Sequence, residues 1–254
     1  MQKPIEFENR GKKISGILHL PDVHKPPIVI ISHGFTGNKN SPLLVTLANY
    51  LEKNGFAVLR FDYRGNGQSS GKFEDMTTGG MIEDLTSAID YVCENEQLDS
   101  NRIGLLGHSL GTTIMILNHD NRVKSTCLIS PVVIHKNSFT LLFDNFAEKG
   151  WQQDFFRQGY VFINKHGGYK VKKDLWDQLR LFDMKREIGE FNKPTLFLCG
   201  NNDDMVDLKD FRDLFYKASE PKEKVEIMGD HVFHGNEEMV CGPVIKWFNK
   251  WLKI

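Results

Sequence analysis

The chain has 254 residues, of which 40% are hydrophobic and 26% charged, and its formal net charge is −1. This length fits one large α/β domain or two small ones, and the composition is ordinary for a globular protein with a sizeable core. The near-neutral charge, without a long charge block, argues against a nucleic-acid partner, and no apolar run reaches the length of a membrane span.

Strand and helix patterns alternate from the amino terminus. The expected elements are strands at 5–8, 14–20 and 28–32, a helix at 42–53, a strand at 56–61, a helix at 81–94 and a strand at 103–106. The stretch Asn9-Arg10-Gly11-Lys12 between the first two strands is a hairpin signal. Ser41 is the expected N-cap of the first helix, with Pro42 at its first position.

The alternation returns in the carboxy-terminal half. The elements expected there are strands at 124–130 and 195–199, a helix at 208–216, a strand at 224–228 and an amphipathic helix at 237–252. This order predicts a mostly parallel, doubly wound α/β sheet led by an antiparallel hairpin.

Residues 134–192 interrupt the alternation. They are rich in aromatic side chains, contain Gly167-Gly168 and show no clear strand of the main sheet. A structureless loop of this length is improbable in a compact domain. We interpret the segment as an inserted cap, mostly helical, over the ends of the sheet, between a first core part (1–133) and a second (193–254). About half of its aromatic residues would form a small core, and the others are candidates for a pocket wall.

The string Gly107-His108-Ser109-Leu110-Gly111 reads G-x-S-x-G. It lies between the apolar run 102–106 and the mostly apolar run 112–117, which can begin a helix. A bare Gly-Ser turn is common, but strand, tight turn and helix together are the context of a nucleophile elbow, in which the serine hydroxyl is exposed above the sheet. The context predicts that Ser109 is a nucleophile.

A serine nucleophile needs a histidine to accept its proton and a carboxylate to orient that histidine. In this type of fold the acid follows the serine and the histidine comes last. The strand at 195–199 leads into a loop with three aspartates, at a strand end where catalytic groups gather. Asp207 best fits an N-cap of the helix from 208. We predict Asp203 as the acid, with Asp204 and then Asp207 as alternatives.

Two histidines follow the last expected strand. His231 is nearer the strand end, from which its ring can reach back across the sheet, and His234 is just before the final helix. Their H-x-x-H spacing has no helical frame and no nearby third ligand, so it does not predict a metal site. We predict His231 as the general base and His234 as the alternative.

The strand at 28–32 ends in His33-Gly34-Phe35-Thr36-Gly37. Alone, this string is typical of an ordinary turn. Beside a nucleophile elbow, such a loop supplies one backbone N–H of an oxyanion hole, and the residue after the nucleophile supplies the other. We therefore predict Phe35 and Leu110 as the donors, each contributing about 3 kcal/mol of transition-state stabilisation.

Along nearly its full length the sequence resembles the α/β-hydrolase superfamily. Several strings resemble its serine-esterase branch that includes the feruloyl (cinnamoyl) esterases: residues 33–38, 61–69, 71–77, 107–111 and 200–203. In such families the acid is the aspartate of a G-x-x-D-x-x-V string, here 200–206, which implies Asp203. The base follows an acidic or polar residue, as in Asp230-His231. The resemblance implies hydrolysis of a small-molecule carboxylic ester through an acyl-enzyme, without metal or organic cofactor.

The resemblance is weaker in the cap, where residues 169–190 look more like generic members of the superfamily, and Asp207 stands where many relatives have proline. Aromatic density in the cap favours an apolar or planar acyl group. The resemblance at 36–38 and 73–77 then implies a short-chain or hydroxycinnamoyl ester as the expected substrate. The same triad would serve a lysophospholipase, an acyl-thioesterase, a peptidase or a C–C bond hydrolase. A non-catalytic binding protein with this fold is the alternative from another class.

The cysteines and the amino terminus bear on the compartment. Cys93, Cys127, Cys199 and Cys241 are scattered without a C-x-x-C pair, and residues 1–11 lack the apolar core of a signal peptide. Reduced, buried thiols in a cytoplasmic protein are the corresponding expectation.

Overall fold

The computed structural model describes residues 1–133, 135–164 and 168–253. Its main sheet has eight strands in the order β1-β2-β4-β3-β5-β6-β9-β10. These are β1 (Gln2–Asn9), β2 (Lys12–His19), β3 (Ile28–Ser32), β4 (Ala57–Phe61), β5 (Ile103–His108), β6 (Val123–Ile129), β9 (Thr195–Gly200) and β10 (Lys222–Ile227). The pairs β1–β2 and β2–β4 are antiparallel, and the other neighbours are parallel. The predicted fold class is confirmed.

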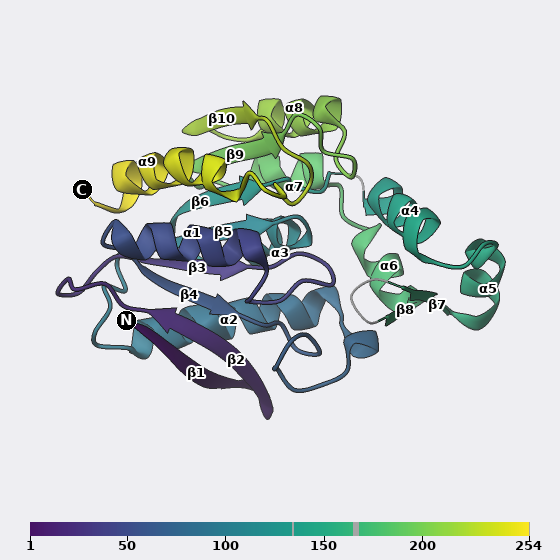
Figure 1. The fold of residues 1–254 in the computed structure, drawn as a ribbon, viewed down its shortest axis with the longest axis horizontal. Coiled ribbons are helices and arrows are strands. Elements are labelled where there is room, and N and C mark those ends of the chain that lie inside the picture. Colours follow the sequence, from purple (N-terminus) through teal and green to yellow (C-terminus); the bar gives the residue numbers. More distant parts are fainter. Residues whose placement is uncertain (134, 165–167, 254) are drawn as a thin grey trace.

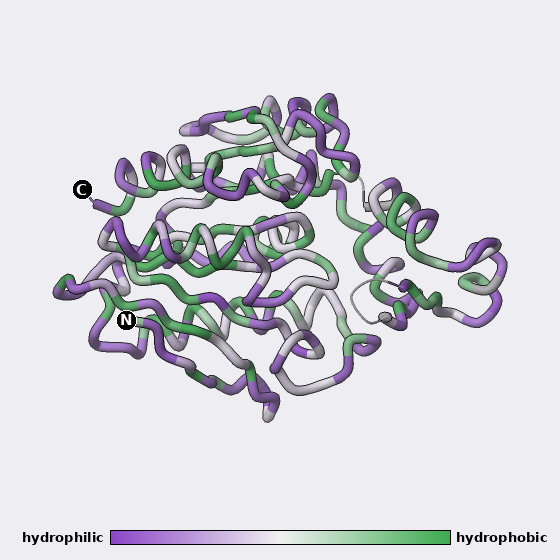
Figure 2. The backbone as a smooth tube through the Cα atoms, in the orientation of Figure 1, coloured by the Kyte–Doolittle hydropathy of each residue, from purple (hydrophilic) through white to green (hydrophobic). Residues whose placement is uncertain are grey.

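Helices cover both faces of this sheet (Figure 1). One face carries α1 (Pro42–Lys53) and α9 (Cys241–Leu252), and the other carries α2 (Thr78–Glu94), α3 (Leu110–Asn118), α7 (Met184–Glu190) and α8 (Leu208–Lys217). Successive strand residues point to opposite faces, so Val29 and Ile31 pack in the core under α1 and α9, whereas Ile28 and Ile30 pack under α2 and α3. Figure 2 shows the hydrophobic residues concentrated along the central strands.

The final helix and the N-cap of the first helix differ from the sequence pattern. The run expected as one helix at 237–252 is a 3-10 turn, η2 (Glu237–Val240), followed by α9. Pro243 lacks a backbone N–H and is tolerated only in the first turn of a helix, so α9 begins just before it. Ser41 does precede α1, but its hydroxyl donates to the backbone oxygen of Asn38 at 2.9 Å and does not cap the helix.

The segment 134–192 lies between β6 and β9 and contains α4 (His135–Phe146), α5 (Trp151–Gln158), α6 (Lys173–Leu179) and α7. It also contains a hairpin that the sequence pattern did not predict, formed by β7 (Tyr160–Ile163) and β8 (Tyr169–Lys172), which stays separate from the main sheet. Aromatic rings hold this segment together, with Phe143 packed against Trp151, Phe155 and Trp176.

The elements of this segment do not all occupy one region. In Figure 1, α4, α5, α6 and the β7–β8 hairpin project beyond one end of the sheet, while α7 packs against α3 and α8 of the main layer. Ile134 and Gly167, two residues of the predicted cap, lie outside the described residues. The division into two core parts and an inserted cap stays a prediction.

The order of the strands determines where a site can form. The chain passes from β3 outward to β4 and then returns to β5 on the other side of β3. The loops that follow β3 and β5 therefore diverge and leave a crevice at the carboxyl ends of the strands, where ligands bind in open α/β sheets. No helix among the described residues is long and apolar enough to cross a bilayer.

Candidate active site

Ser109 lies on a tight turn between β5 and α3. Its backbone has φ 53° and ψ −123°, a conformation that costs free energy for a residue with a side chain. Backbone hydrogen bonds fix the turn. The Ser109 N–H donates to the backbone oxygen of Ile129 at 3.0 Å, and the backbone oxygen of Ser109 accepts from the Thr112 N–H at 2.9 Å. A Cβ on Gly111 would lie 2.5 Å from the Ser32 oxygen, which explains the second glycine of the motif.

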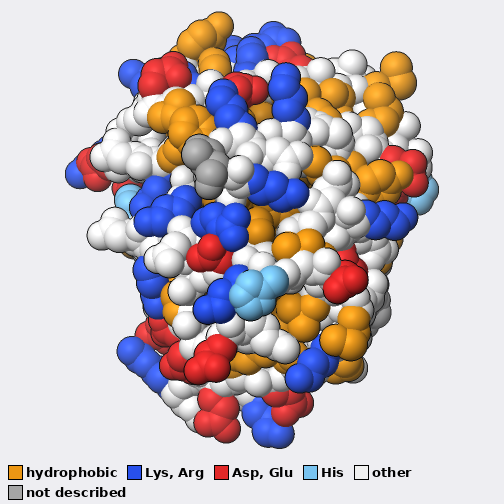
Figure 3. Space-filling model, turned by 90° about the vertical axis from the view of Figure 1, so that its left-hand side faces the viewer, with side chains coloured by type: hydrophobic (Ala, Val, Ile, Leu, Met, Phe, Trp, Pro, Cys, Tyr) orange, Lys and Arg blue, Asp and Glu red, His pale blue; other side chains and the backbone are white. Residues whose placement is uncertain are grey.

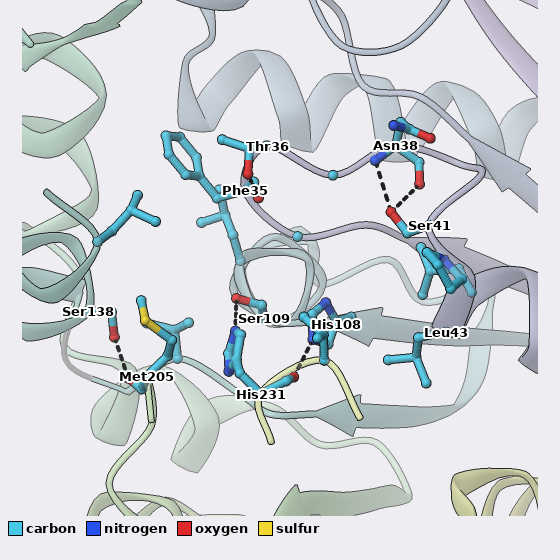
Figure 4. Close-up of a pocket in the computed structure, with 18 of the residues that line it drawn as sticks. Phe35, Thr36, Asn38, Ser41, Leu43, His108, Ser109, Ser138, Met205 and His231 are labelled. Carbon is cyan, nitrogen blue, oxygen red and sulfur yellow. Dashed lines mark hydrogen bonds between the residues drawn. The ribbon is translucent and has the colours of Figure 1, made fainter. Parts of the chain in front are cut away.

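Two side chains from other loops line up behind Ser109, and Figure 4 shows the first of them, His231, hydrogen-bonded to the Ser109 hydroxyl. His231, from the loop after β10, has its Nε2 2.9 Å from the Ser109 Oγ. The Nδ1 of the same ring is 3.0 Å from each carboxylate oxygen of Asp203, from the loop after β9. The structure thus brings the predicted nucleophile, base and acid into one hydrogen-bonded line, although they are far apart in sequence.

The Asp203 carboxylate is fully buried and multiply hydrogen-bonded. Its Oδ1 accepts from the backbone N–H groups of Met205 and Val206, both at 2.9 Å. Burial would raise the pKa of Asp203, but the hydrogen bond and charge of His231 and the Met205 N–H outweigh burial and keep this pKa below its usual value. The acid therefore stays ionised, and as an anion it can stabilise a protonated His231.

The alternative residues lie elsewhere. Asp204 is exposed, and Asp207 is the N-cap of α8, where its Oδ1 accepts from the Lys209 N–H at 2.7 Å. His234 is exposed at the rim of the pocket, and its backbone N–H donates to the Asp230 carboxylate at 2.9 Å. In the described part of the chain, no hydrogen bond joins any of these three side chains to Ser109 or His231.

The two predicted oxyanion donors lie on either side of the nucleophile. Leu110 is the first residue of α3, so its N–H has no partner within the helix. Phe35 lies on the loop after β3, and among the described residues no acceptor within the chain binds its N–H. Gly34 allows this loop to approach, because a Cβ there would lie 3.0 Å from the Ser109 Cβ. Both N–H groups are thus available beside Ser109.

The sequence assigned no role to His108, although it lies within the G-x-S-x-G string. Its Nε2–H donates to the backbone oxygen of His231 at 2.8 Å. This bond ties the loop that carries His231 directly to the turn that carries Ser109. Spacing along the chain gives no sign of such a contact, because the two residues meet only when β5 and β10 share a sheet.

A cavity of about 510 Å³ opens over Ser109. Toward α4 and β8 its wall is mostly apolar, with Phe35, Val132, Phe139, Leu142 and Met205. Two hydrogen bonds hold this wall to the loops of the main sheet, from the Tyr169 hydroxyl to the Thr36 oxygen at 3.4 Å and from the Ser138 hydroxyl to the Met205 oxygen at 3.1 Å. The cavity is large enough for a small organic molecule.

The opposite wall of the cavity mixes polar side chains with the apolar Pro42, Leu43, Leu44 and Val232. It includes Asn38, Asn40 and Ser41 before α1, together with His234 and Glu237. Figure 4 shows Asn38 and Ser41 on one side of Ser109 and Ser138 and Met205 on the other. Ser109 therefore lies between a mostly apolar wall and a mixed one. Within the described residues, no group of three or more His, Cys, Asp or Glu side chains is arranged to hold a metal ion.

Sequence comparison identifies a family. The profile of the family described as alpha/beta hydrolase fold matches residues 27–175. An Escherichia coli protein of 31.7 kDa from the traX-finO intergenic region is 40% identical over 108 residues, which are 42% of this chain and 37% of that protein. The mitochondrial palmitoyl-protein thioesterase ABHD10 of Bos taurus is 34% identical over 91 residues, 36% of this chain and 28% of that protein. The chain thus matches little more than a third of the first of these relatives.

Structural comparison covers more of the chain. Est1E from Butyrivibrio proteoclasticus, with ferulic acid bound, has a TM-score of 0.83 and 23% identity over 98% of this chain and 100% of that one. An esterase domain from a Rhodothermus marinus protein has a TM-score of 0.75 and 22% identity over 99% of both chains. At these identities the likeness concerns the fold.

Proposed function

The chain belongs to the α/β-hydrolase fold family, and we propose that it is a serine hydrolase that cleaves small carboxylic esters through an acyl-enzyme on Ser109. One observation carries the proposal: the hydrogen-bonded line Ser109–His231–Asp203 opens into a cavity with one apolar wall. A serine, a histidine and a buried carboxylate in this geometry activate the serine for attack on a carbonyl carbon.

In the proposed first half-reaction, the Ser109 Oγ bonds to the ester carbonyl carbon while its proton passes to the His231 Nε2. The carbonyl oxygen becomes an oxyanion that accepts hydrogen bonds from the Phe35 and Leu110 N–H groups. The bond between the carbonyl carbon and the alkoxy oxygen then breaks, and the alcohol leaves with the proton from His231. The ionised Asp203 stabilises the imidazolium throughout.

The second half-reaction releases the acid. Water loses a proton to the His231 Nε2 and adds to the acyl carbon, again through an oxyanion. The bond to the Ser109 Oγ breaks, and the serine recovers its proton from His231. Atoms and charges balance with water as the only co-reactant, so we propose that turnover needs neither a metal ion nor an organic cofactor.

The substrate part of the proposal rests on the cavity. Its mostly apolar wall contains aromatic rings, which stack on planar groups and also bury short alkyl chains. Its volume accommodates one small acyl group with its alcohol. A short-chain or hydroxycinnamoyl ester fits these features, and the likeness to Est1E, solved with ferulic acid, agrees with this choice.

A second candidate is an acyl-thioesterase with the same residues in the same roles. The partial match to palmitoyl-protein thioesterase ABHD10 favours it. The triad does not distinguish an oxygen from a sulfur leaving group, so only the pocket and the substrate can decide.

The proposal also includes a cytoplasmic location, which four free cysteine thiols support because thiols stay reduced there.

One substrate panel tests the proposal and ranks the two candidates. We would measure kcat/KM for methyl ferulate, p-nitrophenyl esters from acetate to laurate, lysophosphatidylcholine and an acyl-CoA. We expect the short-chain and ferulate esters to be the best substrates. If the long-chain esters, the lysolipid or the acyl-CoA lead by about tenfold or more, which corresponds to about 1.4 kcal/mol, a lipase or thioesterase replaces the ester proposal.

A further inference from the structure

Two strings that the sequence singled out, 33–38 and 61–69, meet behind the pocket. Lys39 directly follows the first string, and Asp62 belongs to the second. The Asp62 carboxylate is fully buried and accepts three hydrogen bonds: from the Lys39 N–H at 2.6 Å, the Lys39 ammonium at 2.5 Å and the Gln68 N–H at 2.9 Å. The second string contributes no side chain to the cavity.

Every polar group of Lys39 is bound, either to this second string or to Arg60 just before it. Its side chain is only 2% exposed, and its ammonium also donates to the Gln68 Oε1 at 2.8 Å. Its backbone oxygen accepts from the guanidinium of Arg60. Burial of a lysine and an aspartate is costly unless the two are paired and hydrogen-bonded. The pairing is therefore tightly constrained, and Lys39 does not line the cavity.

The Asp62 side is itself rigid. The backbone N–H of Asp62 donates to the backbone oxygen of Ser15 at 2.9 Å, and the backbone oxygen of Asp62 accepts from the Ser69 hydroxyl at 2.6 Å. These bonds fix Asp62 against β2 and the following turn. Gly67 closes this turn with φ +51°, and a Cβ there would overlap the Asp62 carboxylate. The second glycine of the string is thus explained by the space that the carboxylate occupies.

The loop between β3 and α1 has the candidate oxyanion donor near its start and this anchor near its end. Phe35 is four residues before Lys39, and the turn between them contains Thr36 at φ 58° and a bond from the Gly37 N–H to the Gly34 oxygen at 3.0 Å. The front of the loop lines the cavity, and its back is held by Asp62. A shift of Lys39 would therefore move the Phe35 N–H.

We propose that Lys39 and Asp62 are positioning residues of the oxyanion hole: their buried ion pair holds the 33–41 loop so that the Phe35 N–H points at the developing oxyanion. This inference rests on the proposed function. It assigns a role in the reaction to a pair that touches neither the substrate nor the triad. Oxyanion stabilisation depends strongly on position, and a misplacement of about 1 Å can cost about 100-fold in rate.

The test uses Lys39→Met in the full chain. Methionine keeps the backbone bonds of residue 39 and much of its volume but removes the ammonium. We would measure kcat and KM on p-nitrophenyl butyrate and the inhibition constant of propyl trifluoromethyl ketone. This ketone adds the Ser109 Oγ to its carbonyl carbon, and its oxygen then occupies the oxyanion hole. We expect kcat to fall by about 10- to 100-fold, the inhibition constant to rise in parallel and KM to change by less than about twofold.

Arg64→Met is the matched control. Arg64 lies in the same string and pairs with the buried Asp84, but its hydrogen-bonded ion pairs go to α2 and not to the 33–41 loop. The Arg64→Met variant should lose thermal stability, but its kcat and its affinity for the ketone should stay within about twofold of wild type. If Lys39→Met behaves in the same way, the pair is merely structural and the proposal is wrong.

Gln68→Met covers the case in which Lys39→Met does not fold. Gln68 is exposed and contributes one neutral acceptor to the ammonium, so its loss should be tolerated. We expect a milder change in the same direction, about twofold to fivefold in kcat and ketone affinity, since one hydrogen bond to a charged group is lost. Unchanged values in a folded Gln68→Met would overturn the proposal. A wild-type protein that neither cleaves the ester nor binds the ketone would instead refute the proposed function.

Discussion

At the residue scale, the candidate nucleophile differs from ordinary serines in its backbone. Ser109 has a positive φ in a turn fixed by hydrogen bonds to Ile129 and Thr112, and its side chain meets the ring of His231. Such conformations persist only when the surrounding structure determines them. This strain lies at the residue whose hydroxyl must project over the sheet.

The two histidines provide the first prediction. His231→Ala should lower kcat by about 1,000-fold or more, because no other group would accept the Ser109 proton. His234→Ala is the matched control from the same loop and should cost far less, since the His234 side chain is exposed at the pocket rim. Steady-state kinetics on p-nitrophenyl butyrate measure both, and the reverse order would give the role of base to His234.

The neighbouring aspartates provide the second. Asp203→Asn should lower kcat by about 10,000-fold, because the amide no longer holds the His231 ring in the correct tautomer. Asp204→Asn should leave kcat near wild type, since the Asp204 side chain is exposed. Circular dichroism of both variants checks that they are folded. An inactive Asp204→Asn beside an active Asp203→Asn would show that the acid was assigned to the wrong neighbour.

The sequence predicts the meeting of some of these side chains and not of others, for a physical reason. Ser109, Asp203 and His231 each follow a strand, and parallel strands bring their carboxyl ends together, so chain order was enough to predict their meeting. His108 and Lys39 contact partners whose distance depends on the detailed path of the loops. No spacing along the sequence encodes that path, and these contacts emerged only from the structure.

At the element scale, the start of α8 separates a structural aspartate from the candidate catalytic one. Asp207 caps the helix through the Lys209 N–H, so Asp207→Ala should lower the free energy of unfolding by about 1 kcal/mol. Urea unfolding measures this loss, and kcat should be unchanged because Asp207 does not contact the triad. A drop in kcat together with unchanged stability would contradict the assignment.

The elements of the main sheet were easier to predict than those between β6 and β9. β3 is buried along its whole length, and its β-branched run fits only a central strand. In contrast, β7 and β8 have four residues each and pair only with each other. Short strands lack a periodic pattern that distinguishes them from helical or loop residues, so this hairpin was not predicted.

At the scale of the whole molecule, the strand order predicts the place of the site. The crevice between the loops after β3 and β5 contains Ser109, and the loops after β9 and β10 complete it. At the end of the molecule opposite α4–α6, positive and negative side chains are interspersed, as Figure 3 shows for Lys, Arg, Asp and Glu. This mixture matches the net charge of −1.

The pH dependence of the whole protein gives the fourth prediction. A protonated His231 cannot accept the Ser109 proton, so kcat/KM should rise with pH through one ionisation, that of the base. The pKa of Asp203 is held below its usual value, so the acid stays ionised and no second step should occur above about pH 4. A pH–rate profile with two acid-side ionisations in this range would contradict the proposed roles.

Chelation is a control on the same assay. The mechanism has only water as co-reactant, so EDTA should leave kcat/KM unchanged at every pH. Loss of activity with EDTA and its recovery on addition of a divalent ion would show that a metal takes part in the reaction.

The most direct test of the account is covalent labelling of the nucleophile. A fluorophosphonate probe forms a bond from phosphorus to an activated serine oxygen and releases fluoride. We expect peptide mass mapping to find the adduct on Ser109 in the wild-type protein, and the variant Ser109→Ala to show neither labelling nor turnover of p-nitrophenyl butyrate. Labelling at another residue, or labelling and turnover retained in Ser109→Ala, would contradict the acyl-enzyme mechanism.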